Sequence, residues 1–118
     1  MTLTKLALLA LVAAALALPA SASAASKGLV GEVGPGFTIE VTMNGKDVKT
    51  LKAGTYSIKV EDKASIHDFH LKGPGLNKST TVPFTGTKTW KITLKKGTYT
   101  YQCDPHAAMG MKGTIKVT

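Results

Sequence analysis

The chain has 118 residues, which limits it to one ordinary domain, and it carries 15 lysine and arginine residues against 7 aspartate and glutamate, a formal net charge of +8 at pH 7. Every one of these cations is a lysine, and they are scattered along the chain, so a nucleic-acid-binding protein that reads bases with arginine is disfavoured. A surface this basic instead favours acidic partners, through an attraction that weakens with added salt.

Residues 1–24 have the pattern of a secretory signal peptide. One lysine precedes an apolar run from Leu6 to Leu18, which is followed by a proline and a series of small residues. The run is shorter than the roughly 20 residues that a membrane-spanning helix needs. Because the chain has no arginine, a twin-arginine signal is excluded, and any cofactor would be acquired after export. We expect a periplasmic or secreted protein, cleaved after Ala24 or Ala22, with one domain at 25–118.

Short strands separated by glycine, proline and asparagine make up the rest of the chain. Their apolar residues alternate with polar ones, which gives each strand one face for a core and one for solvent. The alternation predicts strands at Phe37–Thr42, Tyr56–Val60, His67–Leu71, Trp90–Leu94, Tyr99–Cys103 and Ile115–Val117, with Phe37, Ile39 and Val41 on one face. Asn44-Gly45 predicts a tight turn, and Gly73 to Pro83 reads as a looser polar segment. This spacing predicts an all-β sandwich or barrel.

One sequence pattern occurs twice. Leu51–Tyr56 matches Leu94–Tyr99 at nearly every position. Each copy predicts a glycine-led turn that leads into a strand whose tyrosine points inward. Two copies are too few for a repeat protein, so we expect equivalent corners in two parts of one sandwich.

The single cysteine, Cys103, is unusual for an exported protein, because oxidising compartments favour paired cysteines. It begins the segment Cys-Asp-Pro-His-Ala-Ala-Met-Gly-Met, which holds His106, Met109 and Met111 and is expected to form a loop between two strands. A further histidine, His67, lies far upstream at the expected start of a strand. The thiolate, the two imidazoles and a thioether together indicate a metal site.

The ligand types favour copper over other metals. Sulfur donors combined with imidazole suit copper, and a trigonal His, Cys, His set with a weak axial Met is typical of electron-transfer sites. Zinc is the main alternative, but a thioether is a poor zinc ligand and the paired spacings of structural zinc sites are absent. A Cys103–His106 nucleophilic pair would suggest an enzyme, yet Pro105 between them on one tight loop gives an unpromising geometry. We predict one copper ion per chain, held by His67, Cys103, His106 and Met111, and no enzymatic activity.

Two other residues compete for ligand roles. His70 shares its expected strand with His67 but has the opposite parity, so we expect an ordinary solvated histidine there. Met109 lies within reach of the loop, but Met111 leads straight into the closing strand through the sequence Met-Lys-Gly. Met109 is therefore expected on an apolar surface near His106.

The two motifs, His67–Leu71 and Cys103–Gly113, resemble the copper-binding signatures of the plastocyanin and amicyanin branch of the cupredoxins. The resemblance implies a Greek-key sandwich of seven or eight strands, mixed rather than purely antiparallel, with the copper at one end. The chain departs from the family pattern at one position: the family usually has Asn directly after the first His, and this chain has Asp68. We expect the backbone to preserve the tie that this Asn makes between the ligand loops.

From this ligand set we expect outer-sphere transfer of single electrons, without bond changes at the metal. His106 is the expected exit for the electron. We expect this protein to be a monomer whose partners are redox proteins with acidic docking surfaces. The alternative is a copper-handling protein that stores or delivers the metal with the same ligands. Four protein ligands in a closed site argue against fast release, because release must break a thiolate bond.

Overall fold

The computed structural model describes residues 27–118. The expected signal peptide and its cleavage sites at Ala22 and Ala24 lie outside the described residues. In the part of the chain that is described, no helix has the length and apolar character needed to cross a membrane.

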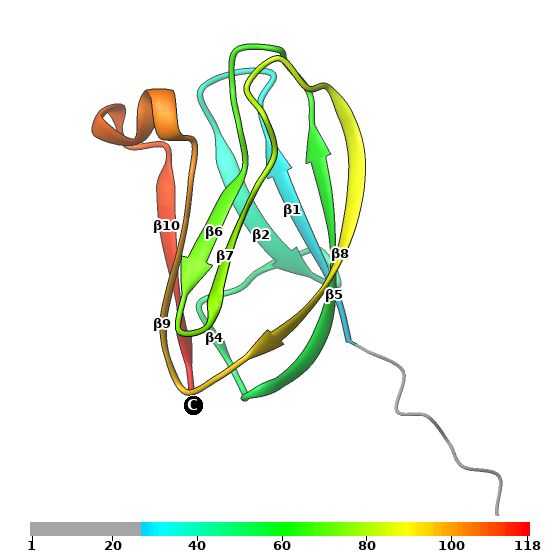
Figure 1. The fold of residues 1–118 in the computed structure, drawn as a ribbon, viewed down its shortest axis with the longest axis vertical. Helices are drawn as coiled ribbons and strands as arrows, with labels where there is room; N and C mark the ends of the chain where they lie inside the picture. Colours follow the sequence, from blue (N-terminus) through cyan, green and yellow to red (C-terminus); the bar gives the residue numbers. More distant parts are fainter. Residues whose placement is uncertain (1–26) are drawn as a thin grey trace, which may run out of the picture.

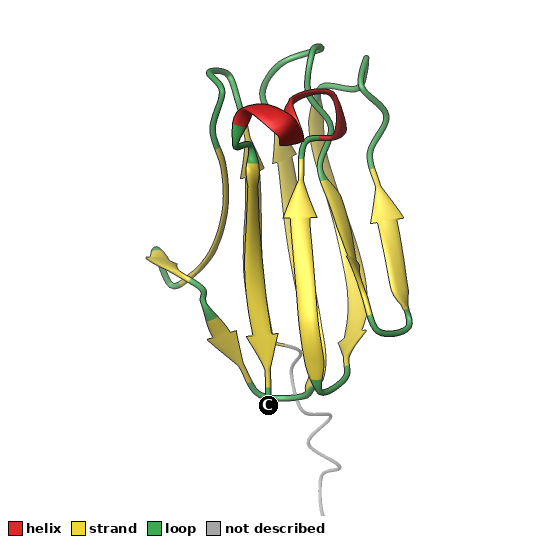
Figure 2. Ribbon diagram, turned by 90° about the vertical axis from the view of Figure 1, so that its left-hand side faces the viewer, coloured by secondary structure: helices red, strands yellow, loops and turns green. Residues whose placement is uncertain are grey.

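Within residues 27–118, ten strands form two five-stranded sheets that face each other (Figures 1 and 2). The first sheet has the order β3-β2-β1-β5-β8, formed by Lys46–Asp47, Ile39–Met43, Lys27–Val33, Gly54–Asp62 and Gly86–Leu94. The second has the order β4-β10-β9-β6-β7, formed by Thr50–Leu51, Lys112–Val117, Gly97–Gln102, His70–Gly73 and Leu76–Ser79. One short 3-10 helix, η1, spans Asp104–Met109.

The strand pairing is mixed. β1 runs parallel to β5 and β4 runs parallel to β10, whereas the other pairs are antiparallel. This arrangement confirms the expected mixed β-sandwich, but residues 27–118 contain ten strands where seven or eight were expected. Two of the ten, β3 and β4, are only two residues long. The loop between β5 and β6 and the helix η1 lie at the same end of the sandwich, away from the C-terminus (Figure 1).

The core between the two sheets is formed by the side chains on the inward faces of the strands, as the alternation predicts. Val41 on β2 is buried, as are Tyr56, Ile58 and Val60 on β5, Ile92 and Leu94 on β8, Tyr99 on β9, and Ile115 and Val117 on β10. Leu29 and Val33 of β1 join them, although the sequence pattern did not indicate that strand. Trp90 and Tyr101 pack against this core at its margin.

The predicted turns and corners are present. Asn44 and Gly45 have φ values of 52° and 77° and connect β2 to β3, as the paired left-handed positions of a tight hairpin turn require. The two matching sequence segments form equivalent corners, because the hydroxyl groups of Tyr56 and Tyr99 each bond to the backbone four residues earlier. The expectation from the repeated pattern is confirmed.

The structure differs from the sequence prediction at three places: two strands begin later than expected, and a segment predicted as a loop contains a strand. Phe37 precedes β2 and is 58% exposed, because the Gly34-Pro35-Gly36 segment turns the chain and Gly34 N–H bonds to Thr38 O at 2.9 Å. The strand expected at His67–Leu71 begins only at His70, so His67 lies in the preceding loop. The segment read as a loose loop contains β7, an exposed edge strand whose polar residues gave no alternating signal.

Candidate copper site

Two loops at one end of the sandwich supply the candidate ligands. The β5–β6 loop carries His67, where Ala64 O accepts the His67 N–H at 3.4 Å and closes a turn. The connection from β9 to β10 begins with Cys103 and continues through η1, which contains His106. The proline at the start of η1 and Gly110, which ends it with φ 96°, keep this connection short and tightly wound.

Backbone hydrogen bonds close the second loop on itself. Cys103 N–H donates to Met111 O at 3.0 Å, and Met111 N–H donates to His106 O at 3.3 Å. His106 N–H in turn donates to Cys103 O at 3.1 Å. Main-chain hydrogen bonds therefore constrain the relative positions of these three residues.

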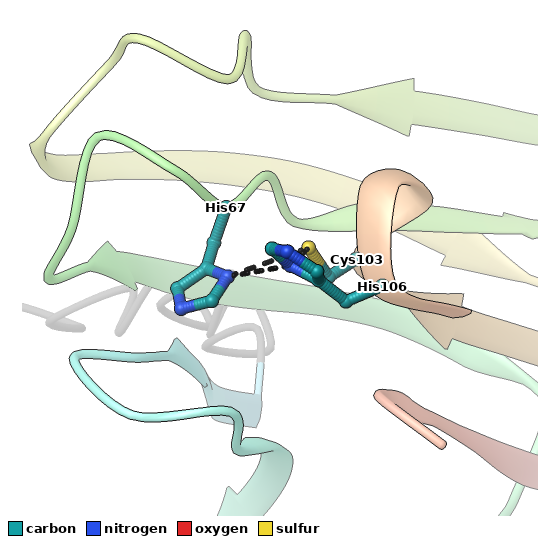
Figure 3. Close-up of side chains that lie close together, drawn as sticks. All are labelled: His67, Cys103 and His106. Carbon is teal, nitrogen blue, oxygen red and sulfur yellow. Dashed lines mark hydrogen bonds between the residues drawn. The ribbon is translucent and has the colours of Figure 1, made fainter. Parts of the chain in front are cut away.

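Three donor atoms converge where the loops meet (Figure 3). The Nδ1 atoms of His67 and His106 are 3.1 Å apart. Cys103 Sγ lies 3.6 Å from His67 Nδ1 and 3.4 Å from His106 Nδ1. His67 and Cys103 are fully buried, and His106 is partly exposed.

The triangle of donors fits a single metal ion. Metal–nitrogen bonds of about 2.0 Å and metal–sulfur bonds of about 2.3 Å place the donors of one ion about 3.3–3.8 Å apart, close to the distances observed. Burial raises the pKa of the Cys103 thiol, so an anionic sulfur at this position requires a cation beside it. Two Nδ1 atoms that face each other also require a proton or a metal between them.

The two methionines near the site differ in their surroundings. Met111 is 2% exposed and belongs to the core cluster, immediately before β10. Met109, at the end of η1, is 68% exposed. The structure thus places Met111 inside the protein and Met109 on its surface, as the sequence pattern predicted.

The tie between the two ligand loops is present but differs from the one expected. The buried carboxylate of Asp68 accepts the N–H of Asp104 at 2.6 Å. A side-chain acceptor on one loop therefore holds the backbone of the other, where we expected backbone groups alone. The parity of a regular strand would have placed Asp68 outward, and it points inward because β6 has not yet begun at this position.

His70 is not the solvated residue that its parity predicted. Its side chain is 17% exposed, and its Nδ1 lies 2.9 Å from the Asp104 carboxylate, while its Nε2 lies 2.5 Å from Asn77 Oδ1. Burial alone would lower the pKa of His70, but the hydrogen bonds to Asn77 and Asp104 outweigh it and raise the pKa. His70 therefore links β6 and β7 to the loop that begins at Cys103.

Two residues next to the site were missed by the sequence analysis. Phe37 was assigned to a strand, but its ring lies edge-on against His106, with centroids 4.9 Å apart, and against His67 at 5.6 Å. Asp62 is the last residue of β5 and is 2% exposed. The sequence did hold a signal for Asp62, because it continues the inward parity of Ile58 and Val60.

A mixed β-sandwich with a closed His, Cys, His cluster at one end defines a copper-binding protein of the cupredoxin class. The model of the copper binding proteins of the plastocyanin/azurin family matches residues 37–118, and the chain belongs to this family. The expected resemblance is thereby confirmed, and copper is the cofactor that the family and the cluster indicate.

Individual proteins agree with this assignment. Rusticyanin from Thiobacillus ferrooxidans is 27% identical, with a TM-score of 0.53 over 77% of this chain and 76% of that chain. Auracyanin from Roseiflexus castenholzii is 21% identical, with a TM-score of 0.55 over 79% of this chain and 98% of that chain, which supports the fold. Plastocyanin A/B of Petroselinum crispum is 52% identical over 31 residues, which make up 25% of this chain and 32% of that protein.

Proposed function

We propose that this protein carries single electrons between redox partners, with one copper ion held by His67 Nδ1, Cys103 Sγ, His106 Nδ1 and Met111 Sδ. The observation that supports this most directly is the convergence of two imidazoles and one buried thiol within 4.8 Å at the end of a sandwich. Family membership points to the same general role, because cupredoxins are mostly electron carriers.

A bound copper ion supplies the one-electron couple between Cu(I) and Cu(II). The chain's own contribution is to hold the donors in one arrangement for both oxidation states, so that little has to move when an electron enters or leaves. The backbone bonds within the Cys103–Met111 loop and the Asp68–Asp104 contact supply this rigidity. Four protein ligands would leave no open position for a substrate, which supports a carrier over an enzyme.

His106 is the proposed exit for the electron. Of the three clustered residues, His106 alone is partly exposed, whereas His67 and Cys103 have no exposed surface. Exposed apolar side chains near this end, Phe37 at 58% and Met109 at 68%, would allow brief contact with a partner. The excess of lysine in the chain as a whole would steer a partner with an acidic docking surface.

The remaining parts of the proposal concern the form in which the protein acts. We propose that residues 1–24 direct export and that residues 25–118 act as a monomeric domain in the periplasm or outside the cell. The apolar run from Leu6 to Leu18 supports export, and the continuous core of the described residues supports a single domain.

The test is the visible and paramagnetic-resonance spectrum of the protein with one equivalent of Cu(II). We expect an intense thiolate-to-copper band that is abolished in Cys103→Ser and retained in His70→Ala, which removes an imidazole close to the site but outside the donor cluster. A protein that stays colourless after addition of copper, or a band that survives Cys103→Ser, would contradict the proposed site.

The axial ligand has a matched pair of variants. Met111→Leu removes the buried thioether, and because this donor favours Cu(II), the reduction potential should rise while the band remains. Met109→Leu makes the same change on the surface and should leave the potential unchanged. The opposite result would assign the axial position to Met109.

Redox cycling separates an electron carrier from a copper store or donor. We expect the copper to stay bound through repeated reduction and oxidation in the presence of a Cu(I) chelator. Rapid loss of Cu(I) to the chelator would favour copper handling, with the same ligands and a different function.

A further inference from the structure

Two buried polar side-chain atoms lack a hydrogen-bond partner among residues 27–118, one on the proposed ligand His67 and one on the last residue of β5, the strand that leads into the loop carrying His67. They are Nε2 of His67 and Oδ2 of Asp62. His67 is completely buried and Asp62 is 2% exposed, so bulk water does not reach either group. Because an unpaired polar group in the protein interior is destabilising, two such atoms in one segment of the chain need an explanation.

Asp62 also organises the loop that carries His67. Its other carboxylate oxygen, Oδ1, accepts the N–H of Ala64 at 3.2 Å, and Ala64 O accepts the N–H of His67 at 3.4 Å. The carboxylate therefore begins the turn that brings the imidazole to its position. Burial raises the pKa of Asp62, and the hydrogen bond from Ala64 N–H and, to a smaller extent, the attraction to His67 oppose this effect.

The two unpaired atoms are complementary. Nδ1 of His67 faces Cys103 and His106, and with copper bound to this atom the ring proton would reside on Nε2, which then needs an acceptor. Figure 3 shows this second nitrogen turned away from the donor cluster. Asp62 Oδ2 has no donor, and a carboxylate oxygen is the acceptor that a ligand imidazole commonly uses.

The space around the ring is closed on another side. A Cβ added at Gly34 would lie 2.9 Å from His67 Cδ2 and 3.5 Å from Nε2, so the backbone of Gly34 packs directly against this edge of the imidazole. The side chain of Ala64 lies 3.5 Å from the same point. Neither of these two neighbours supplies a side-chain acceptor.

We propose that the Asp62 carboxylate accepts the hydrogen bond of His67 Nε2–H, directly or through one buried water, and so acts as a positioning residue for the metal ligand. This inference goes beyond the proposed function, and it rests on the assignment of His67 Nδ1 as a copper ligand. Asp62 then serves twice, since one oxygen shapes the loop and the other fixes the rotation of the ring. A buried negative charge behind the imidazole also makes the ligand a stronger donor to Cu(II).

Asp62→Asn separates these two roles. The amide oxygen still accepts the N–H of Ala64 and preserves the turn, whereas the amide NH₂ group is a donor where Nε2–H needs an acceptor. Glu61→Gln is the matched control, because it removes the same charge from the adjacent residue, whose side chain is on the opposite face of β5 and bonds to Lys59 at 3.1 Å.

The first measurement is the NMR signal of His67 Nε2–H in the diamagnetic Cu(I) protein. In the unmodified chain and in Glu61→Gln we expect a downfield, slowly exchanging proton. In Asp62→Asn the signal should move upfield and exchange with solvent at least about tenfold faster. An unchanged signal in Asp62→Asn, or an equal change in both variants, would overturn the inference.

The second measurement is the affinity for Cu(II). Loss of the acceptor should weaken binding about 10–100-fold, the usual effect of removing such a partner, while Glu61→Gln should change it less than about threefold. If Asp62→Asn does not fold, Asp62→Ser retains an oxygen for Ala64 N–H but is too short to reach the ring, and it is judged by the same two measurements.

The outcomes distinguish this inference from the proposed site. If the thiolate-to-copper band is present and the Nε2–H signal does not respond to Asp62→Asn, the copper site stands and the role of Asp62 is refuted. If the band is absent from the unmodified protein, the site itself fails. A crystal structure of the copper-loaded protein would show whether the contact is direct or passes through a water molecule.

Discussion

The two tyrosine corners allow a prediction in which the chain provides its own control. Tyr99 is fully buried, and its hydroxyl group donates to Pro74 O at 2.7 Å and accepts the N–H of Lys95 at 2.9 Å. The Tyr56 hydroxyl makes only one such bond, to Lys52 O at 2.7 Å. Phenylalanine at either position keeps the ring in the core and removes only the oxygen.

The expected cost follows from the number of bonds lost. Each bond contributes about 1 kcal/mol, and Tyr99→Phe also leaves the Lys95 N–H without its acceptor, so we expect a loss of about 2–3 kcal/mol. Tyr56→Phe should cost about 1 kcal/mol. For a domain of this size, 1 kcal/mol corresponds to about 4–8 °C in Tm, so Tyr99→Phe should melt roughly 8–24 °C lower.

Urea unfolding of the copper-free protein measures both costs without a contribution from metal binding. The slope of the free energy of unfolding against urea should be the same for both variants, because the core is unchanged. Equal losses in the two variants, or a larger loss in Tyr56→Phe, would show that the second bond to Pro74 and the Lys95 N–H contribute little, and would refute the reasoning.

Three further perturbations test other contacts by the same urea assay. Because the pKa of His70 is raised in the folded protein, its pair with Asp104 stabilises the fold fully below about pH 6.5 and loses this effect as the pH rises through the raised pKa. His70→Ala should therefore cost about 0.5–1 kcal/mol of stability at pH 6 and little at pH 9. A cost that does not change with pH would contradict this. Thr80→Val removes the acceptor 2.9 Å from Phe69 N and should cost about 1–2 kcal/mol; no loss would mean that this bond is replaced. Gly31→Ala places a Cβ 2.6 Å from the Phe69 ring and should cost about 1–3 kcal/mol, whereas a neutral result would show that the ring moves aside freely.

Alternation predicted which residues are buried better than it predicted where strands begin. His67, Phe69 and Leu71 are all buried as their parity indicated, although β6 starts only at His70. The inward direction of His67 comes from a turn closed by Ala64, and a loop of this kind has no fixed periodicity. Asp68 illustrates the difference, since it is buried where a regular strand would have exposed it.

The donor cluster was predictable because its residue types are rare in this chain. There is a single cysteine, and the spacing of His106 from it indicated a shared loop. The contacts around the cluster were not predictable, because they depend on which loops meet at the end of the sandwich. Phe37 reaches His106 across a long separation in sequence, and no local pattern reports such a contact.

The placement of the C-terminus has a practical consequence. The chain ends at the pole of the sandwich opposite the β5–β6 loop and η1 (Figure 1). A linker added after Thr118 would therefore attach the protein to an electrode or a fused enzyme with its His106 edge facing outward. Such a tethered form would keep the surface proposed for electron exchange free for a soluble partner, whereas an attachment through η1 would cover it.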